Sequence, residues 1–226
     1  KLYYWDAPFR GNFIRLLLSE ANLSYEEADP TKIYPKKREA IKFPAMAPPI
    51  LYDKEEKSHL SQMPAIVMYL AEKHDLAPKD FFLKAIAAKL IMDCNDVLME
   101  ITNFNGQKMW KQDEWRDFRN NRLSLWMRIF EKTGSSHGLK ENSGFILGKR
   151  ASAADIAAAA LFGTMVYCFP QLKQDLEEQA PKVASLCARI ERRKNISKFL
   201  TKQRKEYGTI YCGGQIEKSI RRMLNA

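Results

Sequence analysis

The sequence contains little cysteine and little histidine. Its 226 residues include four cysteines and three histidines, with no CxxC motif and no histidine at the spacing of metal ligands. A zinc site or a Ser-His-Asp hydrolase has almost no residues to be built from, and we expect no metal. The four cysteines, Cys94, Cys168, Cys187 and Cys212, lie far apart, so we interpret them as reduced thiols, and we expect three of the four to lie in helix cores.

Long apolar runs are also missing. No run approaches the roughly 18 residues that a membrane-spanning helix needs, and residues 1–5 have the pattern of a strand rather than of a secretion signal. We therefore expect a soluble, cytoplasmic protein without a transmembrane segment. A hydrophobic content of 46% with 11% aromatic residues can fill packed cores, which excludes disorder of the whole chain.

The positive charge is unevenly distributed. The net charge is +10, and residues 189–226 hold eleven Lys or Arg against three Glu, an excess of eight positive charges. Such a cluster is typical of a solvated helix face. It could also contact an acidic protein or an anionic surface such as a membrane, whereas a nucleic-acid partner is the least favoured interpretation.

The first third of the chain alternates between strand and helix patterns. Residues 1–5 and 25–28 indicate strands, and residues 10–21 carry apolar side chains at helical spacing. A basic loop with at most one helical turn covers residues 30–44. Residues 48–52 and 59–60 then predict a hairpin, followed by a helix over 64–74 with Pro64 in the first position.

The rest of the chain has only helical patterns. Residues 76–80, with Pro78, form a linker, and long amphipathic helices are expected over 82–101 and 112–132. Ser152 and Asp155 form a capping box before an apolar helix over 153–168, and shorter helices fit 171–178, 181–192 and 196–204. We predict an α/β domain over 1–76 and an all-helical domain over 81–226, with a basic extension from about residue 207.

Four stretches, taken in order, resemble one protein family. They are Leu-Tyr-Tyr-Trp at 2–5 with Arg10 and Phe-Ile-Arg at 13–15, Ala-Pro-Pro-Ile-Leu at 47–51, Gln-Met-Pro-Ala-Ile at 62–66, and Gly148 with Ser-Ala-Ala-Asp at 152–155. Together they make residues 1–204 similar to the glutathione transferases. That resemblance implies a thioredoxin-like, glutathione-binding N-terminal domain followed by an all-α C-terminal domain.

The resemblance also implies a catalytic residue. Tyr4 matches the tyrosine whose hydroxyl stabilises the glutathione thiolate, which is the nucleophile of these enzymes. The alternative is that Tyr4 is only a packed strand aromatic. Arg10 matches an arginine that contacts glutathione in several classes, although an arginine at a helix start can simply be solvated. Ala7 stands where redox-active relatives carry a cysteine, so redox chemistry through that position is not expected.

The expected contacts to the glutathione peptide are incomplete. Pro49 matches a cis-proline whose preceding residue offers its N–H and C=O to glutathione, but that residue is Pro48, which has no N–H. Gln62 matches a glutamine that, with the helix N-terminus, receives the γ-glutamyl carboxylate. The next position usually carries a serine hydroxyl and is Met63 here. Lys42 and the backbone N–H of Met63 are the expected compensation.

Two further features bear on partners. Asp96 matches an acid that meets the amine of glutathione across a dimer in some classes, with Asp93 as its competitor. Residues from Tyr207 onward exceed the usual family length and carry apolar side chains at helical spacing. This tail could wall the crevice between the domains or dock on another protein or a membrane surface.

The resemblance therefore implies an enzyme of detoxification. It implies a cytoplasmic homodimer that conjugates glutathione, as co-substrate, to small apolar electrophiles. The rival interpretation is a non-catalytic binding or scaffold protein on the same fold that has lost tight glutathione binding, and the departures at Pro48 and Met63 favour it.

Overall fold

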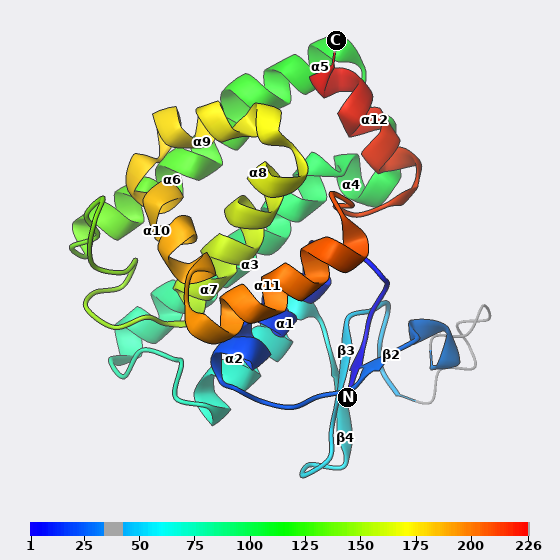
Figure 1. Ribbon diagram of the computed structural model, residues 1–226, viewed down its shortest axis with the longest axis vertical. Coiled ribbons are helices and arrows are strands. Elements are labelled where there is room, and N and C mark those ends of the chain that lie inside the picture. The colour runs from blue at the N-terminus through cyan, green and yellow to red at the C-terminus, as the bar shows by residue number, and fades with distance from the viewer. Residues whose placement is uncertain (34–42, 226) are drawn as a thin grey trace.

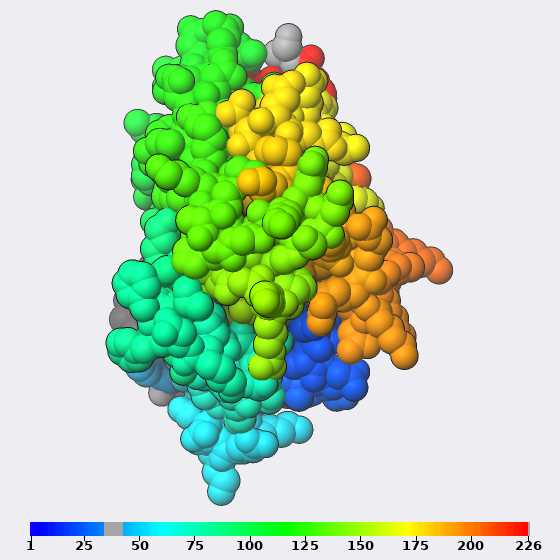
Figure 2. Space-filling view, turned by 90° about the vertical axis from the view of Figure 1, so that its left-hand side faces the viewer, coloured from blue at the N-terminus to red at the C-terminus, as the bar shows by residue number. Residues whose placement is uncertain are grey.

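The computed structural model describes residues 1–33 and 43–225. It consists of a small domain built on a mixed sheet and a larger domain made of helices, which lies above the sheet in Figure 1. The same arrangement is visible from the side in Figure 2, where the β3–β4 hairpin, in cyan, projects at the lower end. The predicted α/β plus all-α architecture is confirmed, while the boundaries at residues 76 and 81 stay a prediction.

Four short strands form the sheet in the order β2-β1-β3-β4. They are β1 (Leu2–Tyr3), β2 (Glu27–Ala28), β3 (Ile50–Asp53) and β4 (Ser58–Ser61). β1 runs parallel to β2 and antiparallel to β3, and β3 and β4 form the predicted hairpin. The first strand is shorter than the predicted residues 1–5.

Two helices share the apolar core of the sheet domain. α1 (Phe9–Glu20) and α2 (Met63–Lys73) pack on each other and on β1 and β3 through Phe13, Ile66, Leu2 and Leu51, among other buried side chains. The helix α2 begins one residue before its predicted start, so Pro64 is its second residue. A single helical turn, η1 (Pro30–Lys32), lies in the predicted basic loop.

A buried arginine fixes the connection between β1 and α1. Arg15 is 1% exposed, and its guanidinium donates to both carboxylate oxygens of Glu27, at 2.7 and 3.0 Å, and to the carbonyl of Ala7 at 2.7 Å. A buried charge costs free energy unless it is paired and hydrogen-bonded. These bonds therefore tie the loop after β1 to strand β2.

The helical part of the chain after α2 starts with a helix at Phe81. Its elements are α3 (Phe81–Ile101), α4 (Asn103–Gly106), α5 (Gln112–Asp117), η3 (Phe118–Leu123), α6 (Ser124–Ser136), α7 (Ala153–Ala158), η4 (Ala159–Gly163), α8 (Thr164–Cys168), η5 (Pro170–Leu172), α9 (Lys173–Gln179), α10 (Pro181–Glu191), α11 (Lys194–Tyr207) and α12 (Gly214–Leu224). The η3 and η4 segments are π-helical turns inside two longer helices. The helices predicted over 112–132 and 153–168 are thus confirmed.

The helix from α7 to α8 is the centre of the helical domain. Every residue from 152 to 165 is buried. The predicted capping box starts it: the Asp155 carboxylate accepts from the backbone N–H of Ser152 at 2.8 Å, the Ser152 hydroxyl at 2.9 Å and the N–H of Ile146 at 2.7 Å. Burial raises the pKa of Asp155, while these hydrogen bonds lower it.

The two domains meet along α1, which packs against α7, η4 and α11. The side chain of Asn12 donates to the Thr164 hydroxyl at 3.1 Å and exchanges hydrogen bonds with Gln203, whose amide nitrogen lies 2.6 Å from the Asn12 oxygen. All three side chains are buried. Because buried polar groups need partners, this network fixes how the domains pack.

Within the described residues no single helix is long and apolar enough to cross a membrane; only Ala153–Cys168 taken together with Pro170–Gln179, bent by 118°, meets that test of length and composition. All four cysteines are free, and Cys94, Cys168 and Cys187 are buried in the helical domain. The interpretation of three cysteines as core residues is confirmed.

Candidate functional site

The register of the sheet brings three predicted site residues to one edge. Tyr3 of β1 and Ser61 of β4 both lie opposite Ile50 of the central strand β3. Tyr4 follows Tyr3 and Gln62 follows Ser61, while Pro49 precedes Ile50 because β3 runs antiparallel to β1 and β4. They therefore follow one another across the same edge of the sheet, although they are far apart in sequence.

Tyr4 packs at the start of α1. Its hydroxyl accepts a hydrogen bond from the backbone N–H of Arg10 at 3.1 Å, and its side chain is largely buried, with the residue 6% exposed. The ring leaves no room for a larger residue at Gly11, where an added Cβ would lie 2.4 Å from a ring carbon. Burial raises the pKa of Tyr4 to about 12, against the opposing charge of Arg10. The phenol therefore stays protonated at neutral pH, and its O–H can donate a hydrogen bond.

Arg10 connects this edge to the helical domain. Its Nε donates to the side-chain oxygen of Asn95 on α3 at 3.2 Å, and its guanidinium lies 4.8 Å from the centre of the Phe9 ring. Burial lowers the pKa of Arg10, although the group stays charged. Arg10 is thus half-buried and bonded rather than simply solvated.

The C-terminal tail crosses the start of α1. The N–H of Phe9 donates to the carbonyl of Tyr211 at 3.2 Å, and the two rings meet edge to face with centroids 5.3 Å apart. The Tyr211 ring also lies 4.9 Å from Phe169. Tyr211 is 1% exposed, and its hydroxyl has no hydrogen-bond partner in the described part of the chain. The tail thus packs on the start of α1, and whether it also contacts a substrate or a partner stays a prediction.

A buried carboxylate holds the tail in this position. Glu217 of α12 accepts from three consecutive backbone N–H groups, those of Tyr211, Cys212 and Gly213, at 3.0, 3.0 and 2.6 Å. Arg221 pairs with the same side chain at 2.7 Å. Desolvation raises the pKa of Glu217, but the hydrogen bonds more than offset it and leave the pKa below its ordinary value. We call Glu217 and the three amides the tail latch.

The opposite end of the edge offers fewer donors. The bond between Pro48 and Pro49 is cis, as predicted. Gln62 is exposed, makes no side-chain capping bond and has a φ of 73°, a strained conformation for this residue. Met63 is 1% exposed with its side chain in the core, so only its backbone N–H faces outward at the start of α2. Pro64 removes the next N–H of that helix end.

Two other predicted site residues lie apart from this edge or cannot be placed. Asp96 on α3 is exposed, and partial burial together with the charges of Asp93 and Glu100 raises its pKa. Its competitor Asp93 is buried and paired with Lys89. Lys42 lies outside the described residues, so its predicted role is untested.

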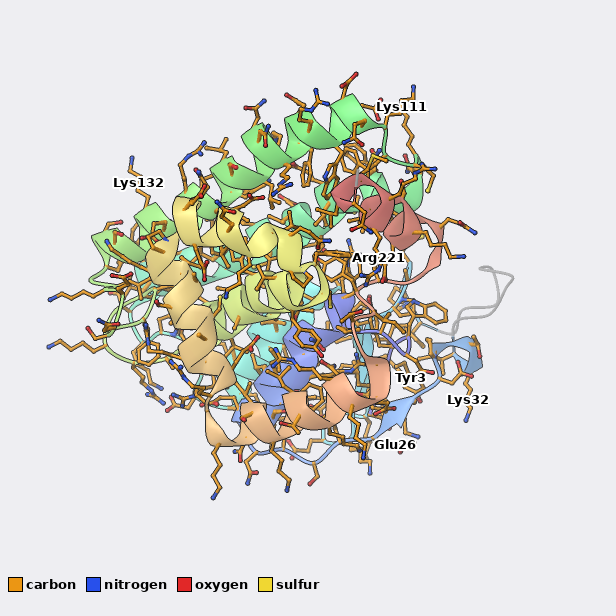
Figure 3. The ribbon with its side chains drawn as sticks, turned by 45° about the horizontal axis from the view of Figure 1, so that its top comes forward. Tyr3, Glu26, Lys32, Lys111, Lys132 and Arg221 are labelled. Carbon is orange, nitrogen blue, oxygen red and sulfur yellow. The ribbon has the colours of Figure 1, made fainter. Side chains whose placement is uncertain are left out.

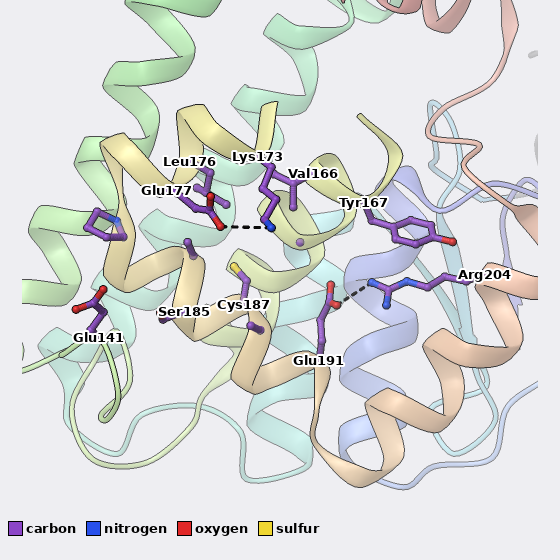
Figure 4. A pocket seen from close by; sticks show the side chains of 14 residues that line it. Glu141, Val166, Tyr167, Lys173, Leu176, Glu177, Ser185, Cys187, Glu191 and Arg204 are labelled. Carbon is purple, nitrogen blue, oxygen red and sulfur yellow. Dashed lines mark hydrogen bonds and ion pairs between the residues drawn. The ribbon is translucent and has the colours of Figure 1, made fainter. Parts of the chain in front are cut away.

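A wide groove lies elsewhere in the helical domain. It has a volume of about 650 Å³ between α8, α9, α10 and α11, with Tyr167, Cys187 and the Glu191–Arg204 ion pair in its lining (Figure 4). None of the predicted site residues lines it. The groove is therefore separate from the sheet edge.

Comparison with known proteins agrees with this architecture. The sequence model described as "Glutathione S-transferase, C-terminal domain" matches residues 86–223, more than half of the chain. The chain belongs to the glutathione S-transferase family.

Among curated relatives, mouse glutathione S-transferase A3 is 24% identical over 221 residues, covering 93% of each chain. Rat glutathione S-transferase alpha-1 is 27% identical over 206 residues, covering 88% of this chain and 86% of the relative.

Solved structures share the fold at low identity. The Pi-class glutathione S-transferase of Onchocerca volvulus superposes with a TM-score of 0.74 at 18% identity, over 94% of this chain and 96% of that one. Rat hPGDS in complex with a quinoline gives 0.69 at 20% identity, over 89% and 95%. These similarities establish the fold and leave the activity to be argued from the site.

Sequence reasoning did not identify Asn95 or Glu217. Asn95 was overlooked beside the two acids of the same helix, and it is the residue that reaches Arg10. Glu217 follows the Gly213–Gly214 pair at the start of a helix, where a carboxylate commonly receives free backbone N–H groups. That signal was available in the sequence.

Proposed function

We propose that this protein is a glutathione transferase that activates glutathione through the hydroxyl of Tyr4. The observation that carries the proposal is the row of Tyr4, Pro49 and Gln62 on one sheet edge, with the Tyr4 hydroxyl already accepting the Arg10 amide. Within the described residues no protein acceptor takes the Tyr4 proton. That proton is available to a sulfur placed at the edge.

The energy required matches one strong hydrogen bond. Lowering a thiol pKa by two units needs about 2.7 kcal/mol of differential stabilisation. A hydrogen bond to a charged group contributes about 1.5–3 kcal/mol. The thiolate would receive that bond from Tyr4, while the positive charge of Arg10 nearby favours the anion further.

We assign the other contacts to the glutathione peptide to the residues predicted from the resemblance, which offer fewer hydrogen-bond donors than the usual family site. Gln62 and the N–H of Met63 would hold the γ-glutamyl carboxylate at the start of α2, and the carbonyl of Pro48 would accept from the cysteinyl N–H. Asp96 of a partner subunit would meet the amine in a homodimer. Lys42 remains a candidate for the glycyl end.

The second substrate is a small apolar electrophile. The rings of Phe9, Tyr211 and Phe169 pack on one another and are buried, so we assign the apolar second substrate from the family resemblance. Detoxification in the cytoplasm is the role we assign to such a reaction.

A homodimer is supported by the exposed apolar side chains on α3: Phe81 is 89% exposed, Phe82 73% and Met92 49%.

The rival function is a non-catalytic binding protein on the same fold. It is favoured by the missing N–H of Pro48, the inward side chain of Met63 and the tail that packs on Phe9 at the start of α1. Each lost hydrogen bond weakens glutathione by about 1–3 kcal/mol, enough in combination to move a micromolar site to millimolar.

Calorimetric titration with glutathione separates the two functions. The transferase proposal expects saturable binding at or below a few millimolar that is lost when Gln62 is replaced by Ala. A control replacement of the exposed Gln107, far from the sheet edge in sequence, should leave the affinity unchanged. No heat of binding at several millimolar glutathione would contradict the transferase and favour the scaffold.

A further inference from the structure

The basic residues near the C-terminus fall into two groups with different roles. The arginines mostly make internal bonds: Arg189 donates to the carbonyls of Glu141 and Gly144, Arg193 pairs with Glu20, Arg204 with Glu191 (Figure 4) and Arg221 with Glu217. Their charges are used to hold the helices together. Of the three basic residues in the predicted extension from residue 207, Arg221 is paired with Glu217, whereas Lys218 and Arg222 are exposed.

The lysines of α11, by contrast, lie on the surface of the protein. Lys194, Lys198, Lys202 and Lys205 are all exposed, and none forms an ion pair with any residue that the structure describes. At 100° per residue their positions fall within an arc of about 80° on the helix surface. The row is about 17 Å long at the helical rise of 1.5 Å. We call these four residues the lysine ridge.

The ridge lies on the outer side of the molecule. The opposite face of α11 is buried through Ile196, Leu200 and Gln203, and the helix packs on α1 and α10. Figure 1 shows α11, in orange, in front of α1, and Figure 2 shows orange residues at the right-hand surface of the protein. Like charges at i, i+4 spacing weaken a helix, so the ridge does not stabilise α11.

We propose that the lysine ridge binds the surface of an anionic lipid bilayer. Lysine is a compact point charge on a flexible stem, suited to many diffuse negative charges rather than to one oriented carboxylate or phosphate. A straight, convex row presents its four charges to a flat surface at once. Each lysine near an anionic lipid surface strengthens membrane binding about fivefold.

Residues near the end of α11 add an apolar contribution. The Arg15 guanidinium donates to the Trp5 carbonyl at 3.2 Å and lies 6.0 Å from the Tyr207 ring, so the loop after β1 adjoins the C-terminus of α11. Trp5 is 44% exposed, and Ile210, just beyond the helix, is 42% exposed. Tryptophan beside basic residues is typical of membrane interfaces.

Other partners fit the ridge less well. Single-stranded nucleic acid is bound by exposed aromatic side chains that stack on bases, and the ridge itself has none. Protein interfaces depend on buried apolar or aromatic anchors at their centre, which a row of lysines also lacks. An anionic bilayer requires neither feature.

Flotation with lipid vesicles tests the proposal. The wild-type protein should bind phosphatidylcholine vesicles that contain phosphatidylserine, release them at high salt and ignore pure phosphatidylcholine. The variant K194Q/K198Q/K202Q/K205Q should lose at least about a hundredfold in affinity, given about fivefold per lysine. The matched control K108Q/K111Q/K132Q/K140Q removes the same charge from exposed lysines that form no ion pair within the described chain and should keep most of the binding.

The control positions lie away from the ridge. Figure 3 places Lys111 and Lys132 at the upper edge of the view, with α11 along the lower edge. If the ridge variant and the control variant lose the same amount of vesicle binding, net charge alone explains the binding and the proposal is wrong. Tighter binding to duplex DNA than to anionic vesicles would also overturn it. Replacing the four ridge lysines with Arg should preserve binding. No readout uses glutathione, so the result is independent of the transferase proposal.

Discussion

The two ends of the sheet edge differ in how completely their polar groups are satisfied. At the β1–α1 end, the Tyr4 hydroxyl accepts from the Arg10 N–H, the Arg10 side chain donates to Asn95, and Phe9 donates to the Tyr211 carbonyl of the tail. At the β3–α2 end, Pro48 has no N–H and Gln62 makes no capping bond. The end proposed to act on a sulfur is therefore more completely hydrogen-bonded than the end proposed to hold a peptide. We therefore expect an activated but weakly held glutathione.

The largest effect is expected from breaking the tail latch. Glu217→Ala leaves three backbone N–H groups and Arg221 without their acceptor, and should lower the free energy of unfolding by about 3 kcal/mol. Urea denaturation measures it. The exposed Glu206, which forms no ion pair among the described residues, provides the control, and Glu206→Ala should change stability by less than about 0.5 kcal/mol. Equal effects would mean that the latch does not hold the tail.

The next effect concerns alkaline pH. The folded pKa of Tyr4 is about 12, above the ordinary value of 10. Its contribution to stability is therefore complete below pH 10 and is lost as pH rises toward 12, by roughly 2–3 kcal/mol. Tyr4→Phe should remove this part of the pH dependence. If the free energies of unfolding of the wild type and of Tyr4→Phe decrease in parallel between pH 10 and about 12, the phenol is not buried as described.

Removing the Tyr4 hydroxyl should also slow conjugation. Tyr4→Phe is expected to lower turnover of an apolar chloronitrobenzene at least tenfold, or about 1.4 kcal/mol, because the thiolate loses its donor. Tyr3→Phe is the matched control, since Tyr3 is the neighbouring phenol, lies beside His59 and is not part of the predicted site. Unchanged turnover in Tyr4→Phe would remove the catalytic role.

Restoring a donor at the weaker end should tighten glutathione. Pro48→Ala supplies the missing backbone N–H and is expected to improve affinity about fivefold, or about 1 kcal/mol. Pro44→Ala, in the same loop and exposed, should have no such effect. Calorimetry on both variants makes the comparison. A Pro48→Ala protein that binds no better would show that this end of the edge does not contact the peptide.

The smallest effect is expected at Tyr211. Its buried hydroxyl has no partner among the residues described, so Tyr211→Phe should raise the free energy of unfolding by up to about 1 kcal/mol. Thermal unfolding can detect the change. A loss of stability would instead indicate that a bound water or an unseen partner satisfies the hydroxyl.

Local patterns predicted most of the fold. The strand, helix and turn signals indicated the element order, and the Ser152–Asp155 capping box follows from neighbouring residues alone, whereas the cis Pro48–Pro49 bond was expected from the family resemblance. Helix and strand periodicity depend on contacts within a few residues, so a single sequence contains them.

The site was less predictable because it depends on distant contacts. Arg10 meets Asn95 across 85 residues, and Phe9 meets Tyr211 at the far end of the chain. No local pattern states which face of α3 or which turn of the tail reaches α1. The orientation of Met63 is similar: the sequence showed a missing hydroxyl, whereas the structure shows that the side chain belongs to the core.

The central claim is that Tyr4 holds the sulfur of glutathione as a thiolate at neutral pH. An ultraviolet difference spectrum of the protein with saturating glutathione measures that species directly. We expect a thiolate band with the wild-type protein that is absent with Tyr4→Phe at equal occupancy. A band of equal size in both proteins, or none in the wild type when calorimetry shows the site filled, would contradict it.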